Sequence, residues 1–213
     1  MIKCILVDFD NTLTTQDTTK FLILSLVLMK PLRIWAVFIG YVLIKLSYDE
    51  SKVQKWKNWI IINLIRGLND DELSQNLDYF NKKVSKVLNK GILSYLKSQR
   101  DEGYHTLLVS ASPEFAIRSI AELADFEILG SIFSKSRIKS CCFGQGKVDR
   151  IIQWQKANLQ EIRIVQAWSD SLSDLPMMNL AEKKIWVCSL KKQSMIKEKF
   201  PNAFFWNHIK AHF

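Results

Sequence analysis

Short apolar runs separated by helix-like segments make up most of this chain. Residues 4–7 are such a run, residues 104–109 and 162–168 are mostly apolar, and each segment is followed at once by polar residues. Continuous apolar runs of this length are typical of strands buried on both faces of a parallel sheet. Segments with helical spacing lie between the later runs, at residues 114–124 and 148–156, as expected for βα units. The pattern therefore predicts an α/β fold with a parallel sheet.

Residues 18–90 interrupt this pattern with a long helical insert. Residues 21–29 and 34–44 are almost wholly apolar, and Lys30-Pro31-Leu32-Arg33 separates them. A single helix over both would be long enough to cross a bilayer, for which about 20 residues suffice. Pro31 and the cations beside it argue against that helix, because proline removes a backbone donor and charges are costly at membrane depth. We expect two short helices joined at residues 30–33.

Two roles for the segment 21–46 stay open. No acid lies between Lys20 and Lys45, and cations flank both apolar helices, a pattern that suits an anionic membrane surface. Alternatively, the helices form the core of a small helical domain or a contact between two copies of the chain. The insert continues with an amphipathic helix from residue 51 and one further helix over residues 69–84.

The charge of the chain favours anionic partners. Lys and Arg number 30 against 21 Asp and Glu, a formal net charge of +9, and the insert holds 12 of these cations against six acids. Phosphate esters, nucleic acid and acidic membrane surfaces all attract such a chain. The sequence has no basic motif with a groove-reading element, so nucleic acid is not an expected partner.

The cysteines and the N-terminal residues bear on location. Cys4, Cys141, Cys142 and Cys188 show no Cys-x-x-Cys spacing, which favours reduced thiols in a cytosolic protein. The first apolar run is too short for a signal peptide and soon meets acidic residues. We expect a cytoplasmic protein, attached peripherally to the inner face of the cytoplasmic membrane if the segment 21–46 docks there.

Two carboxylates, Asp8 and Asp10, follow the first predicted strand at a spacing of two residues. Residues i and i+2 of a strand share a face, and ligands of open α/β sheets bind at the carboxyl ends of the strands. Neighbouring carboxylates repel each other unless a cation or a bound group uses them. Mg²⁺ is the natural choice because it prefers oxygen ligands and often completes its shell with substrate phosphate. The alternative is a purely structural pair that caps the following turn or helix.

Polar side chains follow three further predicted elements. Ser110 ends the strand 104–109, Lys147 stands at the start of a helix, and Asp170 with Asp174 follow the strand 162–168. A lysine is unfavourable at a helix N-terminus unless an anion compensates it. An ordinary strand-to-helix turn and a surface lysine are the structural alternatives for Ser110 and Lys147. Their order along the chain is difficult to explain by independent structural roles.

These elements together resemble the haloacid dehalogenase superfamily of phosphotransferases. Its signature is Asp-x-Asp-x-Thr, a strand-end Ser or Thr, a Lys, and an Asp with a second Asp four residues on. All four are present, and the early insert and Ser-Ala-Ser sequence resemble the phosphoserine-phosphatase-like subgroup. The resemblance implies a Rossmann-like catalytic core, residues 1–17 and 91–213, and an inserted all-helical C1-type cap, residues 18–90.

The resemblance also implies a role for each acid. Asp8 would be the nucleophile that forms an aspartyl-phosphate, and Asp10 would be the general acid and then the base. Mg²⁺ would be held by Asp8, by the backbone carbonyl of Asp10 and by Asp170, while Asp174 would orient the metal shell. An Asp8→Asn variant should therefore keep its fold and lose turnover.

The phosphoryl oxygens would be bound by Ser110, by backbone amides near Ala111 and Ser112, and by Lys147. Two positions depart from the family pattern. Ser169 stands where the family usually has Gly before the metal-binding Asp, which leaves the local backbone uncertain, and Asn11 replaces another usual Gly.

The cap would set substrate specificity. Asp17 falls where phosphoserine phosphatases place an acidic substrate-binding residue, and Arg33 and Arg66 are the only arginines of the cap. Neither arginine lies between residues 51 and 57, where those enzymes keep a carboxylate-binding Arg. Arg33 is retained as a candidate cap residue. The apolar cap is similar to the caps of the phosphatidylglycerophosphatase C family, which act on lipid phosphates.

The sequence therefore predicts a Mg²⁺-dependent phosphomonoester hydrolase acting on a membrane lipid phosphate or another amphipathic phosphate. The enzyme alternative is a soluble phosphatase for a small metabolite, with its apolar cap buried in a dimer. An alternative of another class is a non-catalytic module that binds membrane surfaces. The sequence does not define the oligomeric state.

Overall fold

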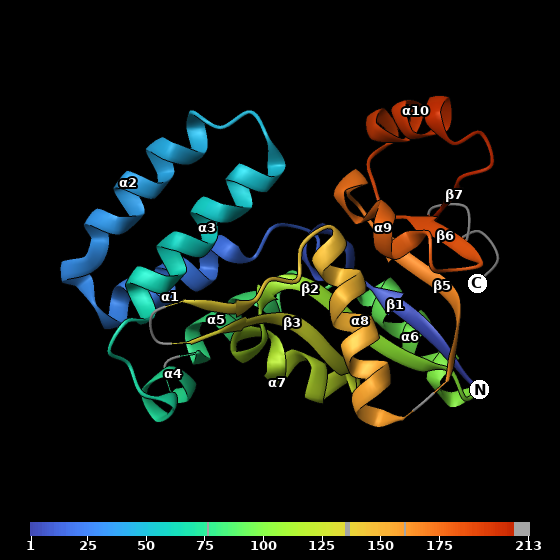
Figure 1. Cartoon of the computed structure of the whole chain (residues 1–213), viewed down its shortest axis with the longest axis horizontal. Coiled ribbons are helices and arrows are strands. Elements are labelled where there is room, and N and C mark those ends of the chain that lie inside the picture. The colour runs from blue at the N-terminus through green and yellow to red at the C-terminus, as the bar shows by residue number, and fades with distance from the viewer. Residues whose placement is uncertain (76, 135–136, 160, 207–213) are drawn as a thin grey trace.

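A seven-stranded sheet forms the centre of the molecule (Figure 1). The computed structural model describes residues 1–75, 77–134, 137–159 and 161–206. The strand order is β4-β3-β2-β1-β5-β6-β7, and neighbouring strands are parallel except for the antiparallel pair β3 and β4. The strands are β1 (Ile2–Val7), β2 (His105–Pro113), β3 (Glu127–Phe133), β4 (Ile138–Ser140), β5 (Ile162–Ser169), β6 (Lys183–Trp186) and β7 (Phe204–Phe205). The predicted α/β fold is confirmed.

Helices cover both faces of this sheet. One hydrophobic cluster joins Ile5 and Val7 of β1 to α6 and α7, and a second joins Leu6 to α8, α9 and α10. Successive residues of β1 thus point into different clusters, which explains why the strand is continuously apolar. The helices are α1 (Thr19–Met29), α2 (Ile34–Lys45), α3 (Glu50–Ile65), α4 (Asp70–Gln75), α5 (Asp78–Val84), α6 (Lys90–Asp101), α7 (Glu114–Ala124), α8 (Gln145–Asn158), α9 (Leu175–Met178) and α10 (Leu190–Lys199); short helical turns span Phe9–Leu13, Pro31–Arg33 and Leu172–Asp174.

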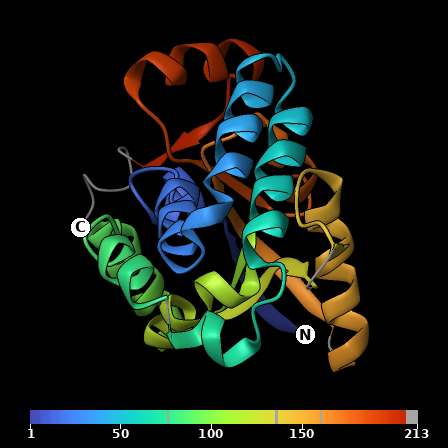
Figure 2. The ribbon, with the colours of Figure 1, turned by 90° about the vertical axis from the view of Figure 1, so that its left-hand side faces the viewer.

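The two apolar helices expected on either side of residues 30–33 are present as α1 and α2. The turn Pro31–Arg33 separates them, as the proline requires. Helix α1 packs into the first cluster through Leu22 and Leu26. Helix α2 buries only Ala36 and Gly40 and lies beside α3 (Figure 2). A Cβ atom on Gly40 would lie 2.2 Å from Cγ1 of buried Ile60, so glycine permits this close approach.

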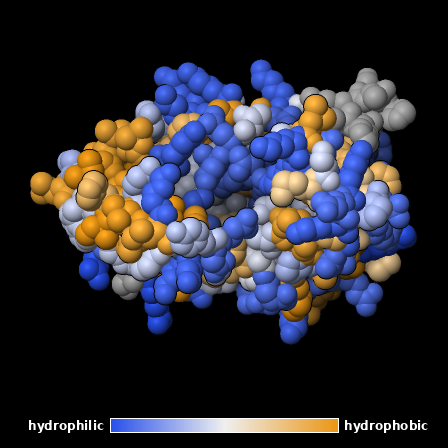
Figure 3. Space-filling model, turned by 90° about the horizontal axis from the view of Figure 1, so that it is seen from above, coloured by the Kyte–Doolittle hydropathy of each residue, from blue (hydrophilic) through white to orange (hydrophobic). Residues whose placement is uncertain are grey.

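The outer side of α2 is apolar and exposed. We call its exposed residues, with Leu32 in the preceding turn, the α2 face: Leu32, Ile34, Trp35, Phe38, Ile39, Tyr41, Val42 and Leu46. Figure 3 shows hydrophobic atoms gathered at the end of the molecule where α1 and α2 lie, beside largely hydrophilic surface. None of the helices in the described part of the chain combines the length and hydropathy needed to cross a membrane.

Three local expectations need correction. Residues 69–84 form two helices, α4 and α5, instead of one. Strand β2 extends to Pro113 instead of stopping at Val109. Helix α8 begins at Gln145, so Gly146 lies inside the helix, where a Cβ atom would meet the carbonyl oxygen of Cys141 at 2.1 Å. The chain turns just before this helix at Gly144, whose φ is +55°.

Candidate active site

A pocket of about 360 Å³ lies at the carboxyl ends of β1, β2 and β5. From β1 the chain runs outward to β2 and β3 and later returns to β5 on the other side of β1, which creates a crevice beside β1. Nearly all the candidate residues identified from the sequence line this pocket: Asp8, Asp10, Asp17, Ser110, Ala111, Ser112, Lys147, Asp170 and Asp174.

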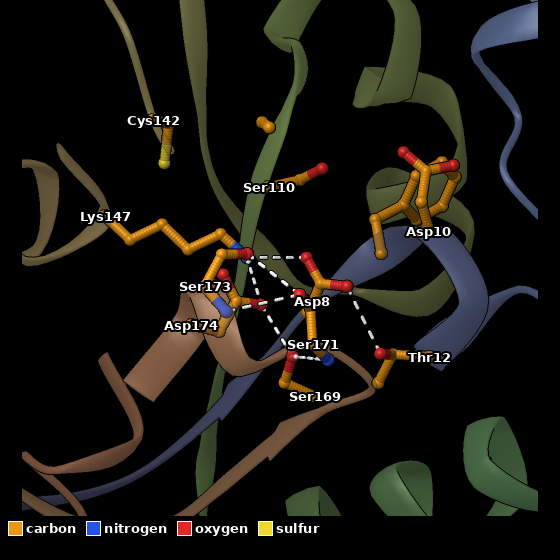
Figure 4. A network of polar contacts seen from close by, with 12 residues as sticks. Asp8, Asp10, Thr12, Ser110, Cys142, Lys147, Ser169, Ser171, Ser173 and Asp174 are labelled. Carbon is orange, nitrogen blue, oxygen red and sulfur yellow. Dashed lines mark hydrogen bonds and ion pairs between the residues drawn. The ribbon is translucent and has the colours of Figure 1, made fainter. Parts of the chain in front are cut away.

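Lys147 joins two of the acids at the bottom of the pocket (Figure 4). Its Nζ donates to Oδ1 of Asp8 at 2.6 Å and to Oδ2 of Asp174 at 2.8 Å. Asp8 follows directly after β1, and its backbone amide donates to the carbonyl of Trp168 on β5 at 3.0 Å. Helix α8 supplies Lys147 from its first turn. Three elements distant in the sequence thus fix one lysine between two carboxylates.

The surface alternative for Lys147 is wrong, because only 1% of this residue is exposed. Burial lowers the pKa of Lys147, but Asp8 and Asp174 outweigh burial and hold that pKa above its ordinary value. The side chain therefore carries a positive charge. Burial raises the pKa of the Asp8 carboxyl to about 8, although the Lys147 ammonium favours the carboxylate. A further cation beside Asp8 would favour its ionised form.

Asp10 is held by donors from two elements, the N-cap of α1 and strand β2. Oδ1 accepts from the backbone amide of Thr18 at 2.6 Å and from its hydroxyl at 2.7 Å, and Oδ2 accepts from the hydroxyl of Ser112 at 2.8 Å. Burial and the charge of Asp17 raise the pKa of Asp10, while these three donors lower it, and the net direction is upward. Because Thr18 is the N-cap of α1, the start of the cap orients this acid.

The turn between Asp8 and Thr12 gives both acids their direction. Asn11 has φ +59°, in the left-handed region that Asn tolerates better than most residues. Asn11, which stands where the family usually has Gly, is thus compatible with the left-handed conformation found here. Thr12 then donates from its hydroxyl to Oδ2 of Asp8 at 3.2 Å, the oxygen that Lys147 does not contact.

The Ser110 to Ser112 segment of β2 forms part of the pocket wall. Ser110 is 1% exposed, and its hydroxyl accepts from the backbone amide of Ser112 at 3.0 Å. The carbonyl of Ala111 accepts from the hydroxyl of Ser131 on β3 at 2.8 Å, which ties this strand end to its neighbour. The segment therefore presents hydroxyl groups and backbone to the pocket from a fixed strand.

Ser169 adds a contact that a glycine cannot make. It is the last residue of β5, and its hydroxyl donates to Oδ2 of Asp174 at 2.6 Å while accepting from the amide of Ser171 at 3.1 Å. Oδ2 of Asp174 thus receives both Ser169 and Lys147. The backbone at this departure from the family pattern still completes a turn that brings Asp174 to Lys147.

Asp170 points to a different partner from Asp174. Its Oδ2 accepts from Nζ of Lys192 on α10 at 3.2 Å, and burial raises its pKa despite this cation. The three residues to which the resemblance assigns Mg²⁺, Asp8, Asp10 and Asp170, all line the pocket. Within the part of the chain that the structure describes, no group of three or more His, Cys, Asp or Glu is arranged to hold a metal.

Lys57 is a pocket residue that the sequence analysis missed. Its Nζ contacts Oδ2 of Asp17 at 2.5 Å. Burial raises the pKa of Asp17, but Lys57 and the hydrogen bond from Thr19 reverse this and lower it overall. The signal was present, because the α3 residues that line the pocket recur at helical spacing: Glu50, Val53, Gln54, Lys57 and Ile61.

Arg33 is not brought to the pocket, and its candidacy as a substrate residue needs correction. Its guanidinium donates to backbone carbonyls at the end of α3, those of Asn63 at 3.0 Å and Leu64 at 3.2 Å, and also contacts that of Arg66. Helix ends leave such carbonyls without helical partners, and a cation there is favourable. Arg33 therefore closes the end of α3 beside the α2 face.

Comparison with known proteins gives the same assignment as the motifs. The family model described as haloacid dehalogenase-like hydrolase matches residues 5–179. No curated protein matches the chain. The fold is similar to a protein with unknown function from Bordetella pertussis Tohama I, which is 16% identical with a TM-score of 0.70 over 96% of this chain and 98% of that one.

Two further solved structures are similar. A phosphoserine phosphohydrolase-like protein from Francisella tularensis subsp. tularensis SCHU S4 is 19% identical, with a TM-score of 0.58 over 92% of this chain and 93% of that one. A phosphoserine phosphatase described as a phospho-aspartyl intermediate analogue is 18% identical, with a TM-score of 0.58 over 96% and 92%. At these identities the likeness shows the fold. Since the family model spans most of the sequence, the chain belongs to the haloacid dehalogenase-like hydrolases, a family of enzymes.

Proposed function

We propose that this protein is a Mg²⁺-dependent phosphomonoester hydrolase that forms an aspartyl-phosphate on Asp8. The observation that carries the proposal is the meeting of Asp8, Asp10, Ser110, Lys147 and Asp170 in one pocket. One solved structure with the same fold is a phosphoserine phosphatase described as a phospho-aspartyl intermediate analogue, which supports this reaction class.

The donors of the pocket fit Mg²⁺. Asp8 and Asp170 supply carboxylate oxygens and Asp10 a backbone carbonyl, the hard ligands that Mg²⁺ prefers together with water and phosphate. Lys147 shares its single charge between Asp8 and Asp174, so a divalent cation beside Asp8 would further favour the ionised form of Asp8. When bound, Mg²⁺ would offset the repulsion between Asp8 and the phosphate and neutralise charge in the transition state.

Asp8 and Asp10 divide the reaction into two steps. In the first, a carboxylate oxygen of Asp8 bonds to phosphorus, the bond to the ester oxygen breaks, and Asp10 gives that oxygen its proton. In the second, Asp10 takes a proton from water as the water oxygen bonds to phosphorus. The bond between phosphorus and Asp8 then breaks, which releases phosphate and restores both acids.

Lys147 and Ser110 bind the phosphoryl group through both steps. The Lys147 ammonium lies 2.6 Å from Asp8 and is held from behind by Asp174, so it is positioned before the substrate arrives. The Ser110 hydroxyl lies on the facing strand end. Asp174, with Ser169, positions Lys147, which adds to the role in orienting the metal shell that the sequence predicted for Asp174.

The substrate is proposed to be a membrane lipid phosphate or another amphipathic phosphate. The α2 face exposes Leu32 by 92% and Phe38 by 73%, and the cap around it is basic. An apolar surface with neighbouring cations suits an interface of anionic lipids. A cap docked there would keep the pocket near headgroup phosphates. The soluble alternative requires a second copy of the chain to cover the same face.

Phosphate release tests the catalytic proposal. Wild-type protein is assayed with Mg²⁺, and with EDTA in its place, on lipid phosphates in mixed micelles and on phosphoserine and sugar phosphates. We expect Mg²⁺-dependent release that the Asp8→Asn variant lacks while its circular dichroism is unchanged. The matched control is Asp125→Asn, an exposed acid outside the pocket. Release by Asp8→Asn at the wild-type rate would remove Asp8 from the nucleophile role.

Vesicle flotation with and without anionic lipid tests the substrate class. Binding that requires anionic lipid, together with preference for lipid phosphates, is the expected result. Failure to bind vesicles, combined with a stable dimer in analytical ultracentrifugation and preference for small phosphates, would replace the lipid proposal by the soluble enzyme.

A further inference from the structure

A second cavity, of about 530 Å³, adjoins the active-site pocket between α3 and the segment around β4. We call it the apolar groove and define it by Trp56, Trp59 and Ile62 of α3 together with Ile138 of β4 and Phe143. Gln54 and Phe143 line both the groove and the active-site pocket. The two cavities are therefore neighbours that share part of one wall.

The groove and the pocket differ in chemistry. Acids, hydroxyls and lysines dominate the pocket, whereas most of the surface of the groove comes from its indole, phenyl and branched aliphatic side chains. Polar residues also line the groove: Ser51, Gln54, Lys55, Asn58, Arg137 and Cys141. The volume of the groove is in the range of small-molecule sites, about 300 to 1,000 Å³, whose walls are mostly apolar. Apolar walls of this kind favour a hydrocarbon or aromatic group, because covering it removes apolar surface from water.

The walls of the groove are held in place by contacts of their own. Trp59 packs edge-on against Trp35 and Trp56, with ring centroids 6.1 Å and 6.4 Å away. Asn58 reaches from α3 to Sγ of Cys141 on the opposite wall at 3.8 Å. Rigid aromatic walls lose little entropy when a ligand binds.

We propose that the apolar groove binds the hydrocarbon part of the substrate while its phosphoryl group occupies the pocket beside Asp8 and Lys147. This inference rests on the proposed phosphatase function and narrows the substrate class to phosphomonoesters with an apolar group close to the phosphate. The observation that supports this inference is that Gln54 and Phe143 line both cavities. The groove and the α2 face have no residue in common, although Trp35 of the α2 face packs against Trp59 of the groove.

A homologous series of alkyl phosphates, from ethyl to octyl at concentrations below micelle formation, tests the groove without a membrane. We expect kcat/KM of the wild-type protein to rise by roughly two- to fourfold for each methylene that enters the groove. The variants Trp56→Gln and Ile138→Gln place a polar amide in opposite walls. Each should reduce the ratio of kcat/KM for octyl to that for ethyl phosphate by about tenfold.

The control variant is Leu32→Gln on the α2 face, which should keep the wild-type ratio because Leu32 does not line the groove. Thermal melting confirms that each variant is folded, and either groove variant suffices if the other fails to fold. Hydrolysis with no dependence on chain length, or an unchanged ratio in a folded groove variant, would overturn the groove and leave the phosphatase intact.

Absence of hydrolysis of every alkyl phosphate, in the presence of Mg²⁺, would instead count against the phosphatase proposal. The groove is then judged by titration calorimetry of octyl and ethyl phosphate with the same proteins. Tighter binding of octyl phosphate by wild type than by the groove variants would support the groove. Equal binding of the two phosphates by wild type would overturn it.

Discussion

The active-site pocket and the α2 face differ in what holds their side chains in place. In the pocket, Lys147 is 1% exposed and its Nζ is bonded to two carboxylates of the same chain. On the α2 face, Phe38 is 73% exposed and Leu32 92%, although both belong to a segment as apolar as a protein core. The partners of Lys147 thus belong to the same chain, whereas no described residue of the chain covers the exposed side chains of the α2 face.

Helices α1 and α2 make the same comparison within the cap. Both are apolar nearly all round, but α1 sends Leu22 and Leu26 into the main cluster, while α2 approaches α3 mainly through Ala36 and Gly40. Apolar composition thus does not distinguish a helix that packs into the core of its own chain from one that stays exposed on its surface. The following variants test this contrast between internal and external partners.

Replacing Lys147 by Met should have the largest effect. The substitution keeps the length of the side chain but leaves Asp8 and Asp174 buried without their cation, and breaking a buried ion pair in this way costs about 3 to 5 kcal/mol. Urea denaturation should show this loss, and phosphate release should fall by at least about a hundredfold because a phosphoryl ligand is lost. The exposed Lys191→Met is the control, and equal stability of the two variants would contradict the internal pairing.

Replacing Ser169 by Ala should have a smaller effect, because Ser169 acts on Lys147 only through Asp174, to which both donate. Asp174 loses the hydroxyl donor at 2.6 Å, a hydrogen bond to a charged group worth about 1.5 to 3 kcal/mol. We expect kcat to fall by roughly ten- to a hundredfold with little change in KM. Ser194→Ala, on the exposed side of α10, serves as the matched variant. Wild-type kcat for Ser169→Ala would show that Lys147 alone fixes Asp174.

Replacing Phe38 by Gln should weaken binding to anionic vesicles by about tenfold, because a partly buried aromatic side chain contributes on the order of 1.5 kcal/mol at an interface. Turnover of a water-soluble phosphomonoester should not change. Leu123→Gln removes a side chain on α7 that is 75% exposed and should bind vesicles as wild type does. Equal losses in both variants would mean that α2 has no special affinity for lipid.

Replacing Gly40 by Ala should have the smallest effect, a loss of about 1 kcal/mol in the free energy of unfolding. Alanine favours the helix by about 1 kcal/mol, but its Cβ would lie 2.2 Å from Ile60, and overpacking of a core costs about 1 to 3 kcal/mol. In an Ile60→Ala background the same substitution should be neutral or stabilising. A loss of equal size in both backgrounds would exclude the contact with α3 as its cause.

The strand ends could be predicted from the sequence because each carries its polar residues directly after an apolar run. Parallel strands share one edge, so Asp8, Ser110 and Asp170 had to meet once β1, β2 and β5 were neighbours. The hydroxyl of Ser169 could not be assigned, because its partner Asp174 depends on the turn Leu172–Asp174. The local sequence pattern therefore predicts the helices and strands, whereas side-chain contacts between them depend on how these elements pack.

The segment 18–90 was less predictable for the same reason. Lys57 of α3 pairs with Asp17, which precedes α1, and spacing along α3 alone cannot reveal this partner. The position of Arg33 likewise depends on another element, because its partners are backbone carbonyls at the end of α3. The two helices on either side of Pro31 were predictable, because a proline acts locally on its own backbone.

The bond between Thr18 and Asp10 links the position of the cap to the chemistry of the pocket. Two of the three donors to Asp10 belong to the residue at which α1 begins. Any swing of α1 that carries Thr18 away would release Asp10 to rotate. In the proposed reaction, the alignment of Asp10 with the substrate would therefore depend on the position of α1.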